Sequence, residues 1–277
     1  MASPRSTGRA TVSGPRASSI EKVEPRILIL NSVGVAEEYR RRRAVGERVL
    51  LARSQDEVDL HQAMEKPVRR VWIGEGTNTW KSDLDLGIEY VRTEGPAGRP
   101  GATLGVPWMA GIPGTIGGWV KMNAGAFGHS ISELVEAVEV DGTWRPRSAC
   151  GFGYRHSDLD GEIRDVRFVP FPAWTETSAD YLVRRKRFPA GTYGSFFKNP
   201  DGDFAGRLLE AADCKGLSVG GADVWREHAN VIVRRAGWTG SDVLALAYLM
   251  RERVRERFGI VLEPEVRGIS FGEVANG

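Results

Sequence analysis

The strongest periodic pattern in the chain lies near its C-terminus, where apolar residues recur every three to four positions. Residues 239–258 place the following on one helical face: Val243, Leu246, Ala247, Met250, Val254 and Phe258. Thr239 and Asp242 have the spacing of a capping box, and Gly259 can end a helix in the left-handed conformation. This pattern predicts a long amphipathic helix.

A second, shorter helix is predicted over residues 204–213. Its apolar positions share one face: Phe204, Leu208, Leu209 and Ala212. Asp203 is a suitable N-cap, because its carboxylate can accept from free N–H groups in the first turn, and Gly216 is expected to end the helix.

Short apolar runs predict strands elsewhere in the chain. Residues 48–52 and 68–74 flank a polar segment that reads as a helix capped by Ser54, so this strand–helix–strand unit predicts a parallel pair. Residues 134–144 predict a strand that enters an Asp-Gly turn. Residues 261–269 predict a strand interrupted by Pro264, hence an edge strand or a bulge.

Composition excludes several classes of protein. The 277 residues are 41% hydrophobic and 27% charged, with a net charge of only +2 and two cysteines. Because the net charge is small, no overall electrostatic field favours binding of nucleic acid. No apolar run approaches the roughly 20 residues that span a bilayer, and two cysteines form no disulfide framework. A soluble protein of a reducing compartment, the cytoplasm, is expected. The first 20 residues contain no acidic side chain and are interpreted as a disordered tail or a transit peptide. The arginine run at 40–43 is interpreted as a solvated face or a phosphate contact.

Two glycine-rich segments predict close approach of backbone to a ligand. Residues 72–78 follow a strand and end in Gly74, Glu75, Gly76, Thr77 and Asn78, which could cradle a pyrophosphate, although such a turn is often only a turn. Residues 110–128 carry six glycines: Gly111, Gly114, Gly117, Gly118, Gly125 and Gly128. Their spacing matches neither a Rossmann nor a P-loop fingerprint, and crowded packing would account for some of them but not for all.

Two polar clusters carry candidate chemistry. Tyr154, Arg155 and His156 follow one another in residues 152–157, where the planar guanidinium of Arg155 would suit a carboxylate. Ser195, Lys198 and Asn199 crowd into the run GSFFKNP, just before the shorter helix. No GxSxG elbow surrounds Ser195 and no His, Cys or Asp spacing suggests a metal site.

Taken in order, the motifs GEGTN, AGIPGTIGGxxxMNAGAFG, YRHS, GSFFKNP, DFAGRLLEAADCKGLSVGGA, EHAN and LEPEVR resemble the UDP-N-acetylenolpyruvoylglucosamine reductases over roughly residues 28–270. The resemblance implies an α+β fold, with a PCMH-type (vanillyl-alcohol-oxidase-like) FAD-binding domain before a smaller α/β substrate-binding domain. It implies a tail at 1–24 and domains at 25–187 and 188–277. It further implies FAD and NADPH as cofactors, a sugar-nucleotide substrate of peptidoglycan precursor synthesis, and a cytoplasmic monomer that needs neither nucleic acid nor membrane.

The resemblance also implies roles for individual residues. In the family reaction a hydride passes from NADPH through FAD to the enolpyruvyl ether, and the resulting enolate is protonated. Ser195 matches the proton donor, Arg155 the group that holds the carboxylate, and Glu265 the group that positions or polarises the site. The FAD-binding residues are expected to be Gly74, Gly76, Thr77, Asn78, Gly111, Pro113, Gly114, Thr115, Gly117, Gly118, Asn123, Ala124 and Gly125. The substrate-binding residues are expected to be Tyr154, Lys198, Asn199, Lys215 and His228, with Phe196 and Phe197 as loop packing and no metal ligand.

The chain departs from the family pattern only in its flavin half. The segment 87–111 is short, a single Gly46 stands where a double glycine is common, and Trp119 and Lys121 occupy a loop that prefers small or uncharged residues. Two alternatives therefore remain beside a working reductase. One is a flavin-deficient, non-catalytic sugar-nucleotide-binding homologue, and the other is a reductase of a different enolpyruvyl or unsaturated sugar nucleotide.

Overall fold

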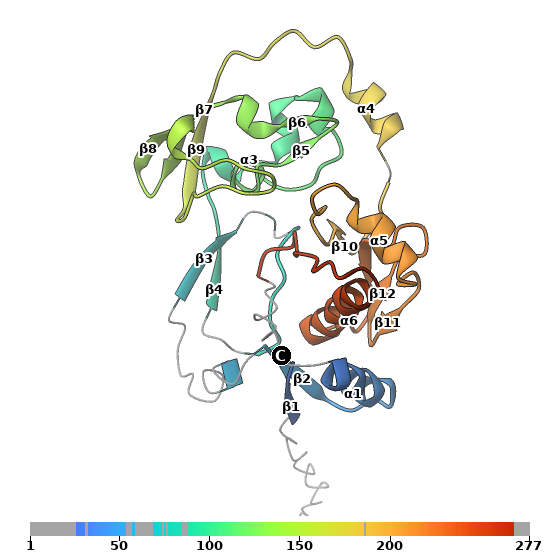
Figure 1. The fold of residues 1–277 in the computed structure, drawn as a ribbon. Coiled ribbons are helices and arrows are strands. Elements are labelled where there is room, and N and C mark those ends of the chain that lie inside the picture. Colours follow the sequence, from blue (N-terminus) through green and yellow to red (C-terminus); the bar gives the residue numbers. More distant parts are fainter. Residues whose placement is uncertain are drawn as a thin grey trace, which may run out of the picture.

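The structure is a computed structural model that describes residues 26–30, 33–53, 57–58, 69–73, 75, 77–84, 88–185 and 187–268. The predicted tail, most of the helix expected after Ser54, and Gly74 and Gly76 lie outside the described residues. Figure 1 shows a middle body, which comprises residues 96–184, above a C-terminal body, which comprises residues 192–258.

The N-terminal part forms two separate pairs of parallel strands. β1 (Arg26–Ile29) leads through helix α1 (Val33–Ala44) to β2 (Val49–Ala52), and β1 pairs with β2. β3 (Arg69–Ile73) pairs with β4 (Ile88–Arg92). Both predicted strands exist, as β2 and β3, but the prediction that they pair with each other is wrong. β2 pairs with β1 and β3 pairs with β4, and the sequence pattern had identified neither of these partners. A short apolar run specifies a strand without specifying its neighbour.

The N-terminal unit packs on the C-terminal body through a buried polar network. Asp242, on α6 (Gly240–Phe258), accepts hydrogen bonds from the Tyr39 hydroxyl at 2.8 Å and from Arg43 Nε at 2.9 Å, both from α1. It also accepts from the backbone N–H groups of Gly221, at 3.1 Å, and Thr239, at 3.0 Å. One member of the arginine run at 40–43 therefore holds two helices together instead of facing solvent.

The middle body is built on an antiparallel sheet in the order β8-β7-β9. Its strands are β7 (Val135–Val140), β8 (Thr143–Pro146) and β9 (Ile163–Phe168). The predicted Asp-Gly turn is confirmed, with φ of 50° at Asp141 and 81° at Gly142. The sheet shares a core with α3 (Ile116–Lys121) and α4 (Ser178–Arg184), and a two-residue hairpin pairs β5 (Gly125–Ala126) with β6 (His129–Ser130). After β4 come three single-turn 3₁₀ helices, Pro96–Gly98, Gly101–Leu104 and Pro107–Met109.

The C-terminal body contains a second antiparallel sheet, in the order β10-β13-β12-β11. Its strands are β10 (Thr192–Ser195), β11 (Ser218–Val219), β12 (Ala222–Val224) and β13 (Val231–Arg234), packed with α5 (Ala205–Ala211) and α6. The prediction for α6 is confirmed, including the capping box of Thr239 with Asp242 and the left-handed Gly259. Its apolar face is buried against the sheet, as the periodicity required.

The predicted start of α5 is wrong in detail. Phe204 stands at the N-cap position and its side chain is 68% exposed, so it is not part of the buried face that Leu208 and Leu209 form. The side chain that reaches the first helical N–H is Asn199, whose Oδ1 accepts from Ala205 N at 3.1 Å. Asp203 instead accepts from Phe204 N and pairs with Arg207. Asn199 takes the capping role because the turn after it folds back over the helix start.

The segment after α6 was predicted as a strand interrupted by Pro264, but its described residues form no continuous strand. It makes isolated bridges, Phe197 with Pro264 and Thr79 with Arg267, because Pro264 has no N–H to continue a ladder. Its backbone bonds Glu265 N to Phe196 O at 2.8 Å and Arg267 N to Asn78 O at 3.0 Å. This segment therefore links the GSFFKNP loop to the residues that follow β3.

Candidate active site

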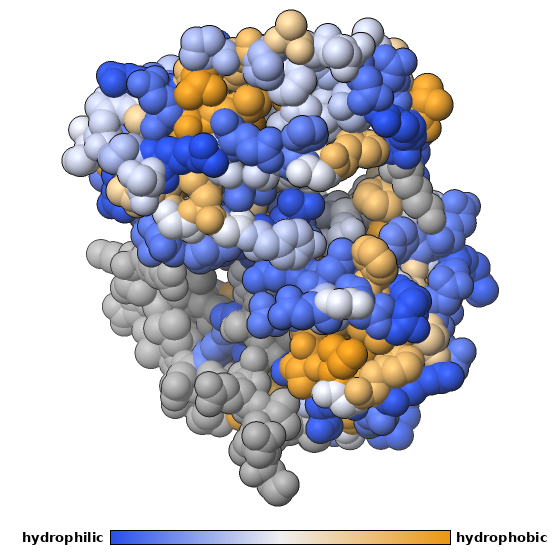
Figure 2. All heavy atoms as spheres, turned by 45° about the horizontal axis from the view of Figure 1, so that its top comes forward, coloured by the Kyte–Doolittle hydropathy of each residue, from blue (hydrophilic) through white to orange (hydrophobic). Residues whose placement is uncertain are grey.

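A cleft of about 1890 Å³, here called the central cleft, lies where the middle body, the residues after β3 and the C-terminal body meet. Figure 2 shows the molecule hollowed between the two bodies, with mainly hydrophilic residues along the rim on this face. The predicted site residues that line it are Thr77, Asn78, Gly111, Pro113, Gly114, Thr115, Gly117, Gly118, Ala124, Gly125, Tyr154, Arg155, Ser195, Asn199 and Glu265. Among the predicted residues that the structure describes, four do not line it: Asn123, Lys198, Lys215 and His228.

Arg155 and Glu265, which are 110 positions apart, form an ion pair in the central cleft. Arg155 Nε donates to Glu265 Oε1 at 3.0 Å, and Arg155 Nη2 donates to the Gly125 carbonyl at 3.0 Å. Arg155 sits in the left-handed region, with φ of 53°, inside the tight turn that bridges Gly153 and His156. A residue other than glycine adopts this conformation only when surrounding contacts enforce it, so the guanidinium is held in place by both its backbone and its partners.

Glu265 is a buried carboxyl group next to a cation. Burial raises the pKa of Glu265 above its usual value, while the charge of Arg155 and its hydrogen bond act against that rise. Asn78 donates its side-chain amide to the Glu265 carbonyl at 3.1 Å, so the residue is fixed from its main chain as well. The carboxyl group is thus positioned firmly and its proton affinity is increased.

Ser195 is the last residue of β10, where the strand departs from regular pairing. β10 pairs Thr192 with Val233 but Ser195 with Val231, so one strand bulges between them. Within the described residues the Ser195 hydroxyl makes no hydrogen bond, and it lines the central cleft. The two phenylalanines that follow are buried and pack edge to face with centroids 5.2 Å apart, as expected of loop packing.

Asn230 fixes the loop after Ser195, a role that the sequence did not reveal. Its Oδ1 accepts from Phe197 N at 2.8 Å and its Nδ2 donates to Phe197 O at 2.8 Å, while its own carbonyl accepts from Phe196 N at 2.8 Å. The residue is only 3% exposed. The signal available in the sequence was a lone amide in the EHAN motif directly before the apolar run of β13, since a buried amide must pair all its groups.

The glycine-rich segment borders the cleft with backbone that bulky residues could not adopt. Gly114 has φ of 111° and its N–H donates to the Glu75 carboxylate at 3.1 Å. Thr115 caps α3 by accepting from Gly118 N at 3.1 Å. Crowding explains Gly117, where an added Cβ would lie 3.3 Å from Ala97. The segment thus combines glycines that packing requires with at least one N–H donor that already holds an anionic group at the cleft wall.

Comparison with known proteins identifies the family. A family model described as UDP-N-acetylenolpyruvoylglucosamine reductase, C-terminal domain, matches residues 186–269. The UDP-N-acetylenolpyruvoylglucosamine reductase of Chloroflexus aurantiacus is 33% identical over 251 residues, which cover 74% of this chain and 84% of the relative. This chain belongs to the UDP-N-acetylenolpyruvoylglucosamine reductase family. Both Ser195 and Glu265 fall within the stretch that the family model matches.

A solved structure supports the same fold. The crystal structure of UDP-N-acetylenolpyruvylglucosamine reductase (MurB) from Thermus caldophilus matches with a TM-score of 0.60 and 31% identity, over 76% of this chain and 88% of that one. The reductase of Helicobacter hepaticus is 40% identical over 165 residues, but these cover 59% of this chain and 63% of the relative. The chain thus spans about three fifths of the length of the first relatives that it matches.

The residues expected to bind the reductase substrate are only partly brought together. Tyr154 is 55% exposed at the cleft, with Arg155 over its ring at 5.2 Å. Asn199 lines the cleft, but its Oδ1 caps α5. The remaining three have other partners: Lys198 pairs with Glu263, Lys215 with Glu210, and His228 Nδ1 accepts from Asn230 N at 3.2 Å.

Asn123, expected to bind the flavin, serves the middle body instead of the cleft wall. It is 7% exposed, its Oδ1 accepts from Ser132 N at 3.1 Å and its Nδ2 donates to Gly153 O at 2.8 Å. These bonds hold the β5–β6 hairpin against the turn that carries Arg155. Asn123 therefore contacts the turn that carries Arg155 and does not line the cleft itself.

The two side chains that depart from the family pattern lie on α3 and line the central cleft, and both bond to the middle body. Trp119 is 3% exposed and its indole N–H donates to Pro113 O at 2.9 Å, while its ring packs against Gly101. Lys121 pairs with Asp160 at 2.9 Å and also donates to the Leu159 carbonyl. In the part of the chain that the structure describes, there is no group of His, Cys, Asp and Glu side chains that could hold a metal ion, and no helix is long and apolar enough to cross a membrane.

Proposed function

We propose that this chain is an NADPH-dependent flavoenzyme that reduces the enolpyruvyl group of UDP-N-acetylenolpyruvoylglucosamine and so produces UDP-N-acetylmuramate, a step in peptidoglycan precursor synthesis. The observation that carries the proposal is the meeting of Arg155, Ser195 and Glu265, from three distant segments, in one cleft. The proposal includes a PCMH-type FAD-binding domain at 25–187, a substrate-binding domain at 188–277, and a monomer that works in the cytoplasm.

The residues of the central cleft fit a flavin dinucleotide. Gly111 and Gly114 have φ of 81° and 111°, which favour glycine, and both line the cleft. Gly114 N now donates to the Glu75 carboxylate, and this N–H could instead donate to a phosphate oxygen of FAD. The cleft also exceeds the roughly 300–1,000 Å³ of a typical single-ligand pocket, which leaves room for a cofactor and a substrate. When bound, the flavin would supply the redox chemistry.

The protein side chains would supply binding and a proton. Arg155 would hold the substrate carboxylate and stabilise the negative charge that develops on it, since a guanidinium pairs bidentately with a carboxylate. Ser195 would protonate C2 of the resulting enolate through its hydroxyl, which within the described residues has no competing hydrogen bond. Glu265, which accepts from Arg155 at 3.0 Å, would position that guanidinium and polarise the site.

Substrate binding by Tyr154 and Asn199 is supported by their position in the central cleft. Lys198, Lys215 and His228 stay predictions from the family resemblance, since none of the three lines that cleft. The charge of Lys198 acts on Glu265, which lines the cleft. Lys198 could turn to a ligand by exchanging its exposed partner Glu263 for a phosphate.

Two measurements on the wild-type protein test the proposal. The purified protein, reconstituted with excess FAD, should quench flavin fluorescence on binding, and it should oxidise NADPH when the enolpyruvyl sugar nucleotide is added. Absence of FAD binding would favour the flavin-deficient sugar-nucleotide-binding alternative. Binding of FAD without turnover of this substrate would favour a different enolpyruvyl or unsaturated sugar nucleotide.

A glycine variant tests the location of the cofactor. Gly114→Val should abolish FAD retention, because it adds a branched side chain at a positive φ and beside the N–H that faces the cleft. Gly202→Val is the matched control, since Gly202 also has a positive φ, of 76°, but lies in an exposed turn with nothing within 4 Å of an added Cβ. Equal FAD affinity in the two variants would refute this location.

A further inference from the structure

Arg234, the last residue of β13, is held between two aromatic rings. Its guanidinium carbon lies 4.3 Å from the centroid of the Tyr193 ring and 4.7 Å from that of Trp238. Its Nε donates to the Gly191 carbonyl at 2.9 Å, and its main-chain N–H donates to the same oxygen at 3.0 Å. A guanidinium stacked and bonded in this way loses little further freedom when it binds a ligand, so it is preorganised.

The charge of Arg234 has no acidic partner among the described residues, although the side chain lines the central cleft. Two other arginines do have acidic partners: Arg235, the next residue, pairs with Asp223, and Arg184, which also lines the cleft, pairs with Glu176 at 2.6 Å. A cation that is fixed by stacking, faces a cleft and lacks a counter-charge is a site for an anionic group of a ligand.

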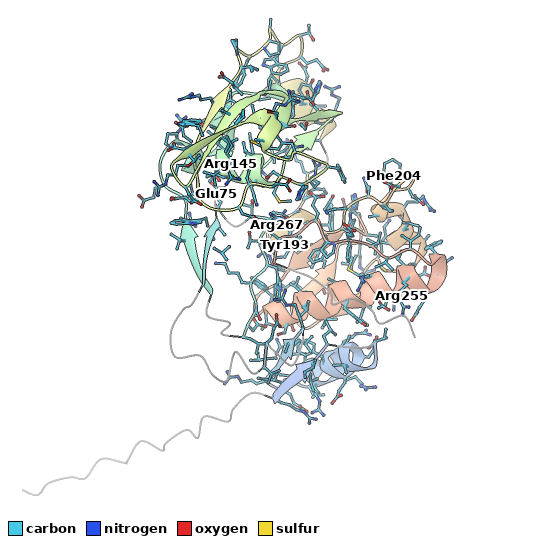
Figure 3. The ribbon with its side chains drawn as sticks, turned by 60° about the vertical axis from the view of Figure 1, so that its left-hand side comes forward. Glu75, Arg145, Tyr193, Phe204, Arg255 and Arg267 are labelled. Atoms are coloured by element: carbon cyan, nitrogen blue, oxygen red, sulfur yellow. The ribbon has the colours of Figure 1, made fainter. Side chains whose placement is uncertain are left out.

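Tyr193 adds a second donor beside this cation. Its side chain is 7% exposed and lines the central cleft (labelled in Figure 3, where the two bodies meet). The hydroxyl makes no hydrogen bond of ordinary geometry within the described residues, although Arg234 lies close enough to act on its ionisation. Burial raises the pKa of Tyr193, against the opposing effect of Arg234, so the hydroxyl stays protonated and can donate.

The position of these two donors relative to Ser195 suggests which anion they meet. β10 pairs Ser195 with Val231, and Arg234 is three residues further along β13, roughly 10 Å away at the rise of a strand. One hexose ring with its two substituents spans a separation of that order. A ligand whose reacting group lies at Ser195 would therefore bring a phosphate attached across the ring to Arg234.

We propose that Arg234 and Tyr193 form a phosphate-binding subsite of the central cleft. The inference rests on the proposed function for the nature of the ligands that enter the cleft. The phosphate belongs either to the diphosphate of the sugar nucleotide or to the reduced nicotinamide dinucleotide. Arg234 provides two N–H groups for one phosphate, and the Tyr193 hydroxyl provides a third donor.

Calorimetric titration of the full chain with UDP, uridine and 2′,5′-ADP tests the subsite. Arg234→Gln should weaken UDP binding by about 10- to 100-fold, the loss expected for charge-assisted hydrogen bonds, and leave uridine binding unchanged. Arg235→Gln is the matched control, because the next residue along the chain is an arginine that is paired with Asp223 and does not line this cleft. Weakening of 2′,5′-ADP alone would assign the phosphate to the nicotinamide dinucleotide and support the same subsite.

Two further variants keep the test independent of folding. Tyr193→Phe preserves the stack and should weaken the affected phosphate ligand several-fold, while Arg234→Lys keeps the charge without the planar fork and should give an intermediate loss. Unchanged affinity of Arg234→Gln for both phosphate ligands would overturn the proposal, as would equal affinity of the wild type for UDP and uridine together with no binding of 2′,5′-ADP.

The outcome can be separated from that of the proposed function. Turnover of the enolpyruvyl sugar nucleotide by the wild type is measured on the same preparation. If the wild type turns over the enolpyruvyl sugar nucleotide but phosphate binding does not depend on Arg234, the subsite is refuted and the reductase function stands. A wild type without turnover but with UDP binding that depends on Arg234 would support the subsite and refute the reductase.

Discussion

Replacing Asn230 by alanine should disturb the loop that carries Ser195. The side chain of Asn230 satisfies both the N–H and the carbonyl of Phe197, at 2.8 Å each, in a position that is 3% exposed. Alanine removes both partners at once. Water cannot easily replace them, because Phe196 and Phe197 are themselves buried at 0% and 1% exposure.

The expected loss follows from the groups left unpaired. A buried donor or acceptor without a partner costs about 1–3 kcal/mol, so two such groups should lower the free energy of unfolding by about 2–6 kcal/mol. Ser195 precedes this loop directly, and Phe196 is bonded to Glu265, so loosening Phe197 displaces two of the proposed reacting side chains. A shift of the order of 1 Å can reduce turnover by about 100-fold.

Urea unfolding followed by circular dichroism, together with turnover of the enolpyruvyl substrate, checks both effects. Ser241→Ala is the control, since Ser241 is also buried, its hydroxyl accepts from Leu51 N at 3.0 Å, and it does not line the central cleft. Ser241→Ala should lose stability but keep its turnover. Asn230→Asp should be no better than Ala at neutral pH, because it loses the donor to Phe197 O. A loss below about 1 kcal/mol for Asn230→Ala, or turnover equal to that of the control, would refute the reasoning.

Three further predictions follow from the contacts described. Ser195→Ala should slow reaction with the enolpyruvyl substrate by about 100- to 10,000-fold, while NADPH reduction of the flavin and thermal stability stay near wild type. Stopped-flow flavin absorbance measures both half-reactions, and unchanged reoxidation of the flavin by the substrate would exclude Ser195 as the acid. Arg155→Lys should cost about 100-fold or more in turnover, because the bidentate fork is lost, and near-normal steady-state rates would place Arg155 outside the site. Burial alone would raise the pKa of Asp242, but the bonds from Arg43, Gly221 N and Tyr39 lower it below 3.8, so this carboxylate stabilises the fold above that pH. Stability should fall as the pH drops below 3.8 toward the lowered pKa of Asp242 in the folded state. Asp242→Asn should flatten this acid limb in thermal melts, and an unaltered limb would contradict the prediction.

Local patterns along the chain were sufficient for the elements whose stability depends on neighbours in sequence. The amphipathic face and capping box of α6 were predicted correctly, since each depends on residues three or four positions apart. The Asp-Gly turn between β7 and β8 was predicted for the same reason. The predicted start of α5 was wrong, because the first helical N–H donates to Asn199, which lies outside the helix pattern, and not to the predicted cap Asp203.

The ordered motifs also determined the family, and with it the three residues proposed to react. Only the tertiary structure decided which of the expected site residues meet. Arg155 is joined to Glu265 across 110 positions, whereas Lys198, Lys215 and His228 have partners outside the central cleft. Asn230 and Arg234 were invisible as functional residues, because their significance lies in strand pairing and ring stacking between segments about 30 to 45 positions apart. Such contacts depend on the path of the whole backbone, which no local pattern of side chains encodes.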